Sequence, residues 1–263
     1  MGAAALAARL PLLFRARPEA TASCGLAFDR PGGPLVAVCG LVGGSGASTL
    51  AFALARQAAR ESALPVLLSE ADSSRAGLAV VAGRAGPLCL RDLAWRLADG
   101  EPPARPFTEL EPRLRLVASA PRTAPDPAPD TVRALLRDAR AAHGLVVIDC
   151  GSAWGSARAV LDETSHVIWT LPASAPAAAR ARVLFASESL PAPGRWRELL
   201  VATAIERRAG AKVRTLRRLA AHRCERLVLA PYVEALARGE QATDGERLRA
   251  PLTALAATLG RVG

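Results

Sequence analysis

Residues 39–49 read CGLVGGSGAST and join an apolar run to a predicted helix through a glycine-rich loop. The run PLVAVCG (residues 34–40) is rich in valine and bounded by proline and glycine, which is typical of a buried strand. The stretch ASTLAFALARQAARES (residues 47–62) carries apolar residues near helical spacing. Such a loop lets the backbone wrap around an anion, and the free N–H groups and dipole of the helix start favour negative charge.

The loop therefore contains the backbone part of a phosphate-binding loop, but not its lysine. Ala47 stands where that lysine is expected, while Ser48 and Thr49 place hydroxyls at the offset used for magnesium. A glycine-rich turn also joins strand to helix in proteins that bind no nucleotide, so the loop alone leaves nucleotide binding open. The predicted nucleotide-binding residues of the loop are Gly43, Gly44, Ser45, Gly46, Ala47, Ser48 and Thr49.

Two further predicted strands end in carboxylates. LVVIDCG (residues 145–151) carries Asp149, and VLLSEAD (residues 66–72) ends with Glu70 and Asp72. A carboxylate beside a phosphate loop can hold magnesium, so we predict a metal site at Ser48 and Asp149. Asp72 is the predicted catalytic residue, placed to orient an attacking water. A polar residue at the end of a strand is common, and only the combination of the three stretches favours a nucleotide site.

Strand patterns alternate with helix patterns along the chain. This alternation predicts one doubly wound α/β domain over residues 34–263, with a mainly parallel sheet covered on both faces, after a loose leader at 1–33. The other predicted strands are 113–120, 166–174, 197–204 and 224–232. The predicted helices after 47–62 are 89–100, 131–144 with Asp130 as its cap, 175–189, an arginine-rich helix before 224, and 245–263; residues 101–112 form a surface loop.

Composition narrows the class of protein. The chain has 263 residues, and its five cysteines form no C-x-x-C pair, which argues against a disulfide scaffold and a zinc site. Cys39 and Cys150 end apolar runs, where cysteine is usually a small buried hydrophobe. No apolar run reaches the roughly 18 residues of a transmembrane helix. We expect a reducing, cytoplasmic location, with a weak membrane contact of the leader as an alternative.

The net charge is +10, and Lys212 is the only lysine. A basic surface suits nucleic acid or an anionic membrane. The densest basic stretch contains Arg207, Arg208, Lys212, Arg214, Arg217 and Arg218. A solvated helix face on an arginine-rich protein explains the same pattern. The stretch could therefore bind DNA, anionic lipid or an acidic partner, or it could bind nothing.

The loop VGGSGAST resembles the K-G-G-x-G-K-[ST]-T loop of the MinD/ParA superfamily of deviant Walker-A ATPases. Within it, GGSGASTLA, LLSEADSSRAGLAVVAG and CLRDLAWRLADGE are similar to the CpaE/TadZ proteins of pili and to actinobacterial septum site-determining proteins. LVLAPYVEALARGE resembles the late P-Y-D turn, which implies that Pro231 contacts the nucleotide. In this comparison Val42 replaces the signature lysine and Ala47 the Walker lysine.

The resemblance implies a P-loop protein that binds ATP or ADP with Mg²⁺, forms a homodimer and contacts a protein of a division, pilus or secretion machinery. The expected role is septum placement or localisation of such a machinery. Without the two lysines, hydrolysis should be weak or absent, because phosphoryl transfer depends on positioned charge. The alternatives are a ParA-like DNA-partitioning ATPase and a pseudo-ATPase that serves as a dimeric scaffold.

Overall fold

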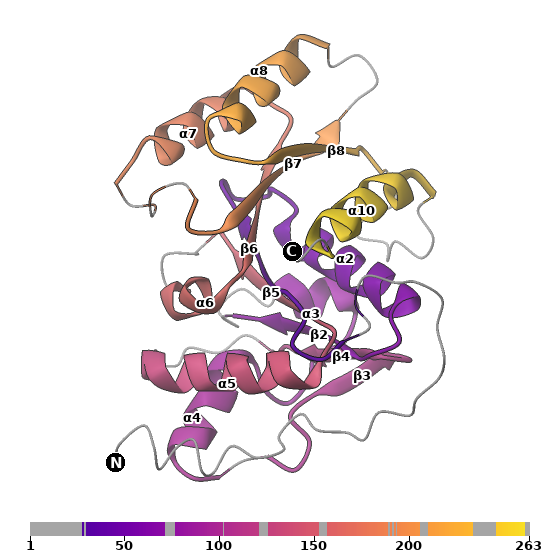
Figure 1. Ribbon diagram of the computed structural model, residues 1–263, viewed down its shortest axis with the longest axis vertical. Helices are drawn as coiled ribbons and strands as arrows, with labels where there is room; N and C mark the ends of the chain where they lie inside the picture. The colour runs from indigo at the N-terminus through magenta and orange to yellow at the C-terminus, as the bar shows by residue number, and fades with distance from the viewer. Residues whose placement is uncertain are drawn as a thin grey trace.

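An eight-stranded sheet forms the centre of the computed structural model, in the strand order β3-β4-β2-β5-β1-β6-β7-β8 (Figure 1). Within the described residues, β3 is antiparallel to β4 and all other neighbouring strands are parallel. The predicted doubly wound, mainly parallel α/β fold is confirmed. The strands are β1 (Leu35–Gly40), β2 (Val66–Glu70), β3 (Thr108–Glu111), β4 (Leu114–Val117), β5 (Leu145–Gly151), β6 (His166–Pro172), β7 (Arg197–Ile205) and β8 (Arg226–Pro231).

The structure describes residues 28, 30–71, 77–101, 103–120, 126–152, 157–188, 190, 192, 194–205, 210–233 and 246–260, with the backbone alone at 204, 205, 210–212 and 246. Among these residues, no helix combines the length and the apolar character that crossing a bilayer requires. Most of the predicted leader lies outside the described residues. Phe28, near its end, is buried in the core, and its carbonyl oxygen accepts a hydrogen bond from the Ser62 hydroxyl at 2.9 Å.

Helices cover both faces of the sheet (Figure 1). In β1, Leu35, Ala37 and Cys39 enter one apolar cluster, while Val36 and Val38 enter the other. This alternation with period two gives a parallel sheet two buried faces. Helices α2 (Ala47–Glu61), α3 (Gly77–Ala82) and α10 (Glu246–Leu259) pack on the face of Val36. Helices α4 (Leu90–Ala98), α5 (Pro129–Ala142), α6 (Arg158–Glu163), α7 (Ala175–Phe185) and α8 (Gly210–Ala221) pack on the face of Leu35.

The structure corrects several predicted elements. The stretch 101–112 was expected to be a surface loop, but it contains β3, which pairs with β4 after a tight turn at Arg113, whose φ is 68°. Asp130 does not cap α5: the N-cap is Ala128, and Asp130 lies in the first turn, where its carboxylate pairs with Arg133 at 2.7 Å. The short helices α3 and α6 were not predicted, and α7 ends at Phe185 rather than at residue 189.

Candidate functional site

The glycine-rich loop leads from β1 into α2 at the carboxyl edge of the sheet. Gly44 and Gly46 adopt φ values of 70° and 80°, in the left-handed region that glycine reaches without strain. Gly46 is also the N-cap of α2 and makes no side-chain capping bond. In an open sheet of this kind, ligands bind outside the carboxyl ends of the strands. The loop therefore has the position and the backbone shape predicted for it.

Buried side chains hold this loop against the sheet. Ser45 is almost completely buried, and its hydroxyl accepts a hydrogen bond from the Thr170 hydroxyl on β6 at 2.9 Å. The Ser45 carbonyl accepts another from the Thr203 hydroxyl on β7, also at 2.9 Å. A Cβ at Gly40 would lie only 2.5 Å from Ser45 Oγ, so this packing requires glycine there. These contacts join residues more than 120 positions apart, so no local sequence pattern could indicate them.

The start of α2 faces a cavity of about 310 Å³. The first described intrahelical bond at this end runs from the Leu50 N–H to the Gly46 carbonyl at 2.9 Å. The N–H groups of Ala47, Ser48 and Thr49 precede that bond and need acceptors from outside the helix. With the helix dipole, these N–H groups make the cavity wall attractive to an anion.

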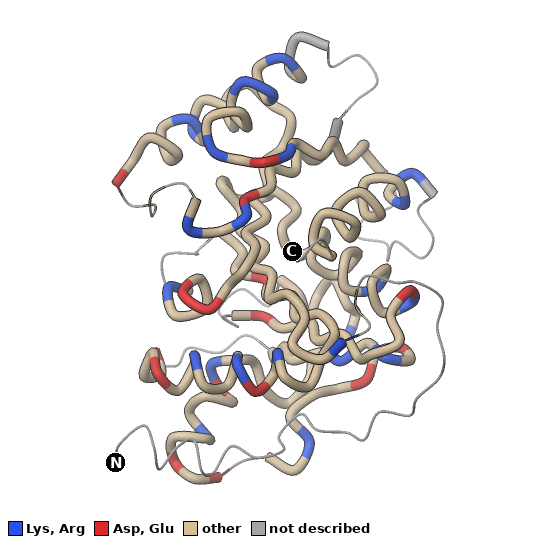
Figure 2. The backbone as a smooth tube through the Cα atoms, viewed as in Figure 1, with Lys and Arg blue, Asp and Glu red and all other residues tan. Residues whose placement is uncertain are grey.

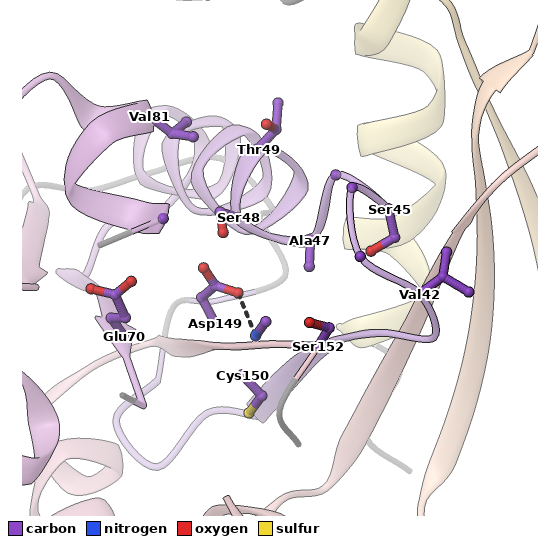
Figure 3. Close-up of a pocket in the computed structure, with 15 residues that line it drawn as sticks. Val42, Ser45, Ala47, Ser48, Thr49, Glu70, Val81, Asp149, Cys150 and Ser152 are labelled. Atoms are coloured by element: carbon purple, nitrogen blue, oxygen red, sulfur yellow. Dashed lines mark hydrogen bonds between the residues drawn. The ribbon is translucent and has the colours of Figure 1, made fainter. Parts of the chain in front are cut away.

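Asp149 lies across the cavity from this helix start (Figure 3). It is buried, its carboxylate accepts a hydrogen bond from the Gly151 N–H at 2.9 Å, and Figure 3 shows the Ser48 hydroxyl pointing toward it. Burial raises the pKa of Asp149 above its usual value, and the Ser48 hydroxyl and the Gly151 N–H act in the opposite direction. The structure thus brings together the two residues predicted to form the metal site.

Glu70 is the second carboxylate of the cavity. It ends β2 directly beside Asp149 in the parallel register, it is buried, and Figure 3 shows it pointing toward the cavity. Its Oε1 accepts a hydrogen bond from the Leu78 N–H on α3 at 3.2 Å. A Cβ at Gly77, the first residue of α3, would lie 2.7 Å from Ser48 Oγ. Helix α3 therefore closes the side of the cavity next to both Ser48 and Glu70.

The described lining of the cavity contains two carboxylates and no lysine or arginine. Ala47 points into the cavity with only a methyl group, and Val42 lies half-buried at its edge (Figure 3). Within the described lining, the positive potential thus comes only from N–H groups and the helix dipole. The full described lining is Val42, Gly43, Gly44, Ser45, Gly46, Ala47, Ser48, Thr49, Glu70, Gly77, Val81, Asp149, Cys150, Gly151 and Ser152.

A second cavity, of about 200 Å³, adjoins the first. The two share Gly44, Gly46 and Thr49 in their walls, and Pro231 lies in the second. Its other wall is largely apolar and includes Tyr232, which is 46% exposed and which sequence reasoning did not single out. The signal for Tyr232 in the sequence was its place beside Pro231 in the stretch that resembles the P-Y-D turn.

Several predicted site residues lie outside the described part of the chain. They include the predicted catalytic Asp72, and Arg207 and Arg208 of the basic stretch. Lys212 falls in α8 with its side chain outside the description. Arg214, Arg217 and Arg218 are described, and all three are exposed on α8.

Comparison with known proteins finds no matching family model and no matching curated protein. Solved structures do match. A ParA family ATPase from Chlorobium tepidum superposes with a TM-score of 0.68 at 16% identity, over 85% of this chain and 98% of that one. A putative plasmid partition protein from Borrelia burgdorferi bound to AMPPNP gives 0.61 at 15% identity, over 88% and 99%. A chain of the MinC:MinD cell division protein complex from Aquifex aeolicus gives 0.62 at 16% identity, over 87% and 95%. The chain has the fold of the MinD and ParA P-loop ATPases.

Proposed function

We propose that this chain, with its MinD/ParA fold, is a nucleotide-binding positioning protein that binds ATP or ADP without a phosphate-binding lysine. One observation carries the proposal: the glycine-rich loop, the start of α2, Ser48 and Asp149 all line one cavity of about 310 Å³. The loop and the helix start supply hydrogen-bond donors for phosphates. The structural match to a partition protein bound to AMPPNP supports this assignment.

The residues present fit Mg²⁺. This ion prefers oxygen ligands and usually binds through one or two carboxylates together with phosphate oxygens and water. Asp149 and the Ser48 hydroxyl lie close together in the wall of one cavity, and Glu70 lies beside Asp149 in the sheet register. Ser48 and Asp149 would hold the ion, and the ion would neutralise phosphate charge in a cavity whose described walls carry no cationic side chain.

Hydrolysis is proposed to be weak or absent. Positioned positive charge stabilises the transferring phosphoryl group, and its loss costs several kcal/mol (~3 kcal/mol for one such group). Neither Ala47 nor Val42 can supply that charge. Asp72 is proposed to orient water where any turnover occurs. Nucleotide binding through backbone N–H donors can persist without the lysines. Slow hydrolysis would keep the protein in its nucleotide-bound state, and hence with one partner, for longer.

The second cavity is proposed to take the base and ribose of the nucleotide. It continues from the phosphate loop through Gly44, Gly46 and Thr49, and it is largely apolar, as an aromatic base requires. Pro231 and Tyr232 lie at the end of β8 and form its far wall. Both are proposed as contacts of the nucleotide.

The proposed cellular role is placement of a septum or localisation of a pilus or secretion machinery, as in the CpaE/TadZ and septum-site branch that the loop resembles. The chain would act as a homodimer that binds a protein partner, in the cytoplasm or at the membrane periphery. The structural match to a chain of the MinC:MinD complex supports a partner-binding role. If the cavity binds no nucleotide, the alternative is that the protein is a pseudo-ATPase scaffold, which forms a dimer without nucleotide.

Titration with a fluorescent ATP analogue tests the proposal. Asp149→Asn keeps the size of the side chain but removes its charge, so it should weaken binding in magnesium about tenfold or more, or ~1.4 kcal/mol. Asp130→Asn is the matched control, because Asp130 is 81% exposed on α5 and does not line the cavity. Equal affinity of wild type and Asp149→Asn would exclude Asp149 from the site.

A specific surface supports the second candidate, a ParA-like DNA-partitioning ATPase. Helices α7 and α8 contact each other and contain no acidic residue, and Figure 2 shows basic segments along both. Contacts of such residues with DNA phosphates are insensitive to sequence and sensitive to salt. The exposed arginines of this surface are Arg180, Arg182, Arg214, Arg217 and Arg218.

A further inference from the structure

Cys39 and Cys150 form a pair of thiols at the base of the nucleotide site. Cys39 lies directly before Gly40, the last residue of β1, and Cys150 directly follows Asp149 on β5. These strands are parallel neighbours, and the pairing shifts by one residue at this point, so that Cys39 faces Gly151. Both side chains enter the same apolar cluster, and Cys150 is close enough to influence the pKa of the Cys39 thiol.

The chemistry of the site described above does not use this pair. The Cys150 side chain points away from Asp149, toward the opposite face of the sheet (Figure 3). Its thiol donates a long hydrogen bond of 3.9 Å to the Ile148 carbonyl. Cys39 is completely buried, and burial together with the neighbouring Cys150 raises its pKa well above the usual value. Cys39 is therefore held as the neutral thiol.

A small molecule can reach Cys150 from the face opposite Asp149. A cavity of about 180 Å³ lies there between the starts of α4, α5 and α6, and Cys150 lines it. This volume is several times the ~30 Å³ that one water molecule occupies in the liquid. Its described lining is Ala71, Leu90, Arg91, Asp126, Pro127, Pro129, Val132, Cys150, Ala157, Arg158, Ala159 and Val160.

We propose that Cys39 and Cys150 are a modification site, oxidised by a small hydroperoxide to a disulfide that ties β1 to β5. Cys150 reacts first because it lines the cavity. Its sulfur attacks hydrogen peroxide; the S–O bond forms, the O–O bond breaks, and the leaving hydroxide takes up the thiol proton, relayed through water, and departs as water. The Cys39 sulfur then attacks the sulfenic sulfur, the S–S bond forms, and the hydroxyl leaves with the thiol proton as a second water. Two thiols lose two electrons, and one hydrogen peroxide is reduced to two waters.

The disulfide would have a structural consequence for the site. It would join β1, which leads into the phosphate loop, to β5, which carries Asp149. Cys39 is the neighbour of Gly40 in the sequence, and Cys150 is the neighbour of Asp149. A crosslink between residues so distant in sequence restricts the unfolded chain. The oxidised protein should therefore show a higher thermal midpoint than the reduced protein. The thiol chemistry itself does not depend on the proposed nucleotide binding.

Intact mass spectrometry of the native protein after hydrogen peroxide treatment tests the proposal. Formation of the disulfide should lower the mass by about 2 Da per chain, and dithiothreitol should restore it. Cys24 and Cys39 share the tryptic peptide 16–56, whereas Cys150 lies in peptide 141–158, so the crosslink is best mapped in a Cys24→Ser variant. A crosslink between these two peptides, reversed by the reductant, is the expected result.

Two variants sharpen the test. Cys150→Ala should abolish the mass loss, whereas Cys224→Ala should keep it, because Cys224 lies outside the pair. The proposal is overturned if the crosslink joins any other cysteine, if the loss persists in Cys150→Ala, or if Cys150 only gains oxygen. An unchanged wild-type mass after prolonged treatment also overturns it. The peptide map of the Cys24→Ser protein decides the question even if Cys150→Ala fails to fold.

Discussion

Glu70 on β2 and Asp149 on β5 lie directly opposite each other in the parallel register, both buried in the wall of one cavity. Burial disfavours the charged form of a carboxylate. The described lining offers hydroxyl and N–H donors but no cationic side chain to balance these charges. A polyanion entering this cavity should therefore require a bound cation more strongly than in a loop with lysine.

The first prediction concerns stability and pH. Because burial raises the pKa of Asp149, folding favours its protonated form, so Asp149 lowers the free energy of unfolding as pH rises through the raised pKa. Asp149→Asn removes the buried charge and should thus stabilise the protein at pH 7–8 by about 1 kcal/mol. Urea unfolding at several pH values measures this, and the gain should shrink on acidification. A variant less stable than wild type at pH 8 contradicts the prediction.

The second prediction concerns the packing under the loop. Gly40→Ala places a Cβ 2.5 Å from Ser45 Oγ and 3.3 Å from the Gly151 carbonyl oxygen, so it should destabilise the protein by about 1–3 kcal/mol. Gly43→Ala is the control, because its Cβ has no neighbour within 4 Å and its φ is not positive; it should change stability by less than about 0.5 kcal/mol. Chemical denaturation compares the two, and equal effects would show that Ser45 does not constrain the loop.

The third prediction restores the missing charge. Ala47→Lys adds an ammonium where the side chain points into the cavity, facing Asp149 (Figure 3). We expect nucleotide affinity to rise about tenfold, with phosphate release above the wild-type level. Val80→Lys adds the same charge at a position that is 75% exposed on α3 and should change neither. If both variants raise nucleotide affinity equally, the increase comes from the net charge of the protein and not from a charge placed in the cavity.

The fourth prediction tests the alternative that the protein is a DNA-partitioning ATPase. If α8 binds DNA, the double variant Arg214→Gln with Arg217→Gln should make binding less sensitive to salt. The negative slope of log affinity against log salt concentration should become shallower by about 2. Arg247→Gln with Arg249→Gln, two exposed arginines on α10, is the matched control on the other face of the sheet. Fluorescence anisotropy with duplex DNA at several salt concentrations measures the slopes. Identical slopes in the two double variants would show that Arg214 and Arg217 do not contact DNA.

Local patterns predicted the strands and helices that frame the site. The valine-rich run before the glycines indicated β1, the helical spacing after them indicated α2, and LVVID indicated β5; the structure contains all three. Strand β3 was missed because its four residues stand among prolines, and its pairing with β4 is visible only in the fold. Helices α3 and α6 have six residues each, too few for a clear helical period.

The arrangement of the site needed the structure. The sequence predicted Ser48 and Asp149 as a pair, and both line the same cavity. It could not show that Thr170 and Thr203 hold Ser45, nor that Glu70 stands in register with Asp149, because these contacts join distant segments through the sheet. Tyr232 was missed for the same reason, since its relation to the loop exists only once β8 is placed in the sheet.

The magnesium dependence of nucleotide binding tests the central claim most directly. Purified protein is titrated with a fluorescent ATP analogue in magnesium and again in EDTA. We expect binding in magnesium and at least about tenfold weaker binding in EDTA, because the described cavity walls hold carboxylates without a cationic side chain. No binding at millimolar analogue in either condition would contradict the account and leave the fold as a scaffold without a working nucleotide site.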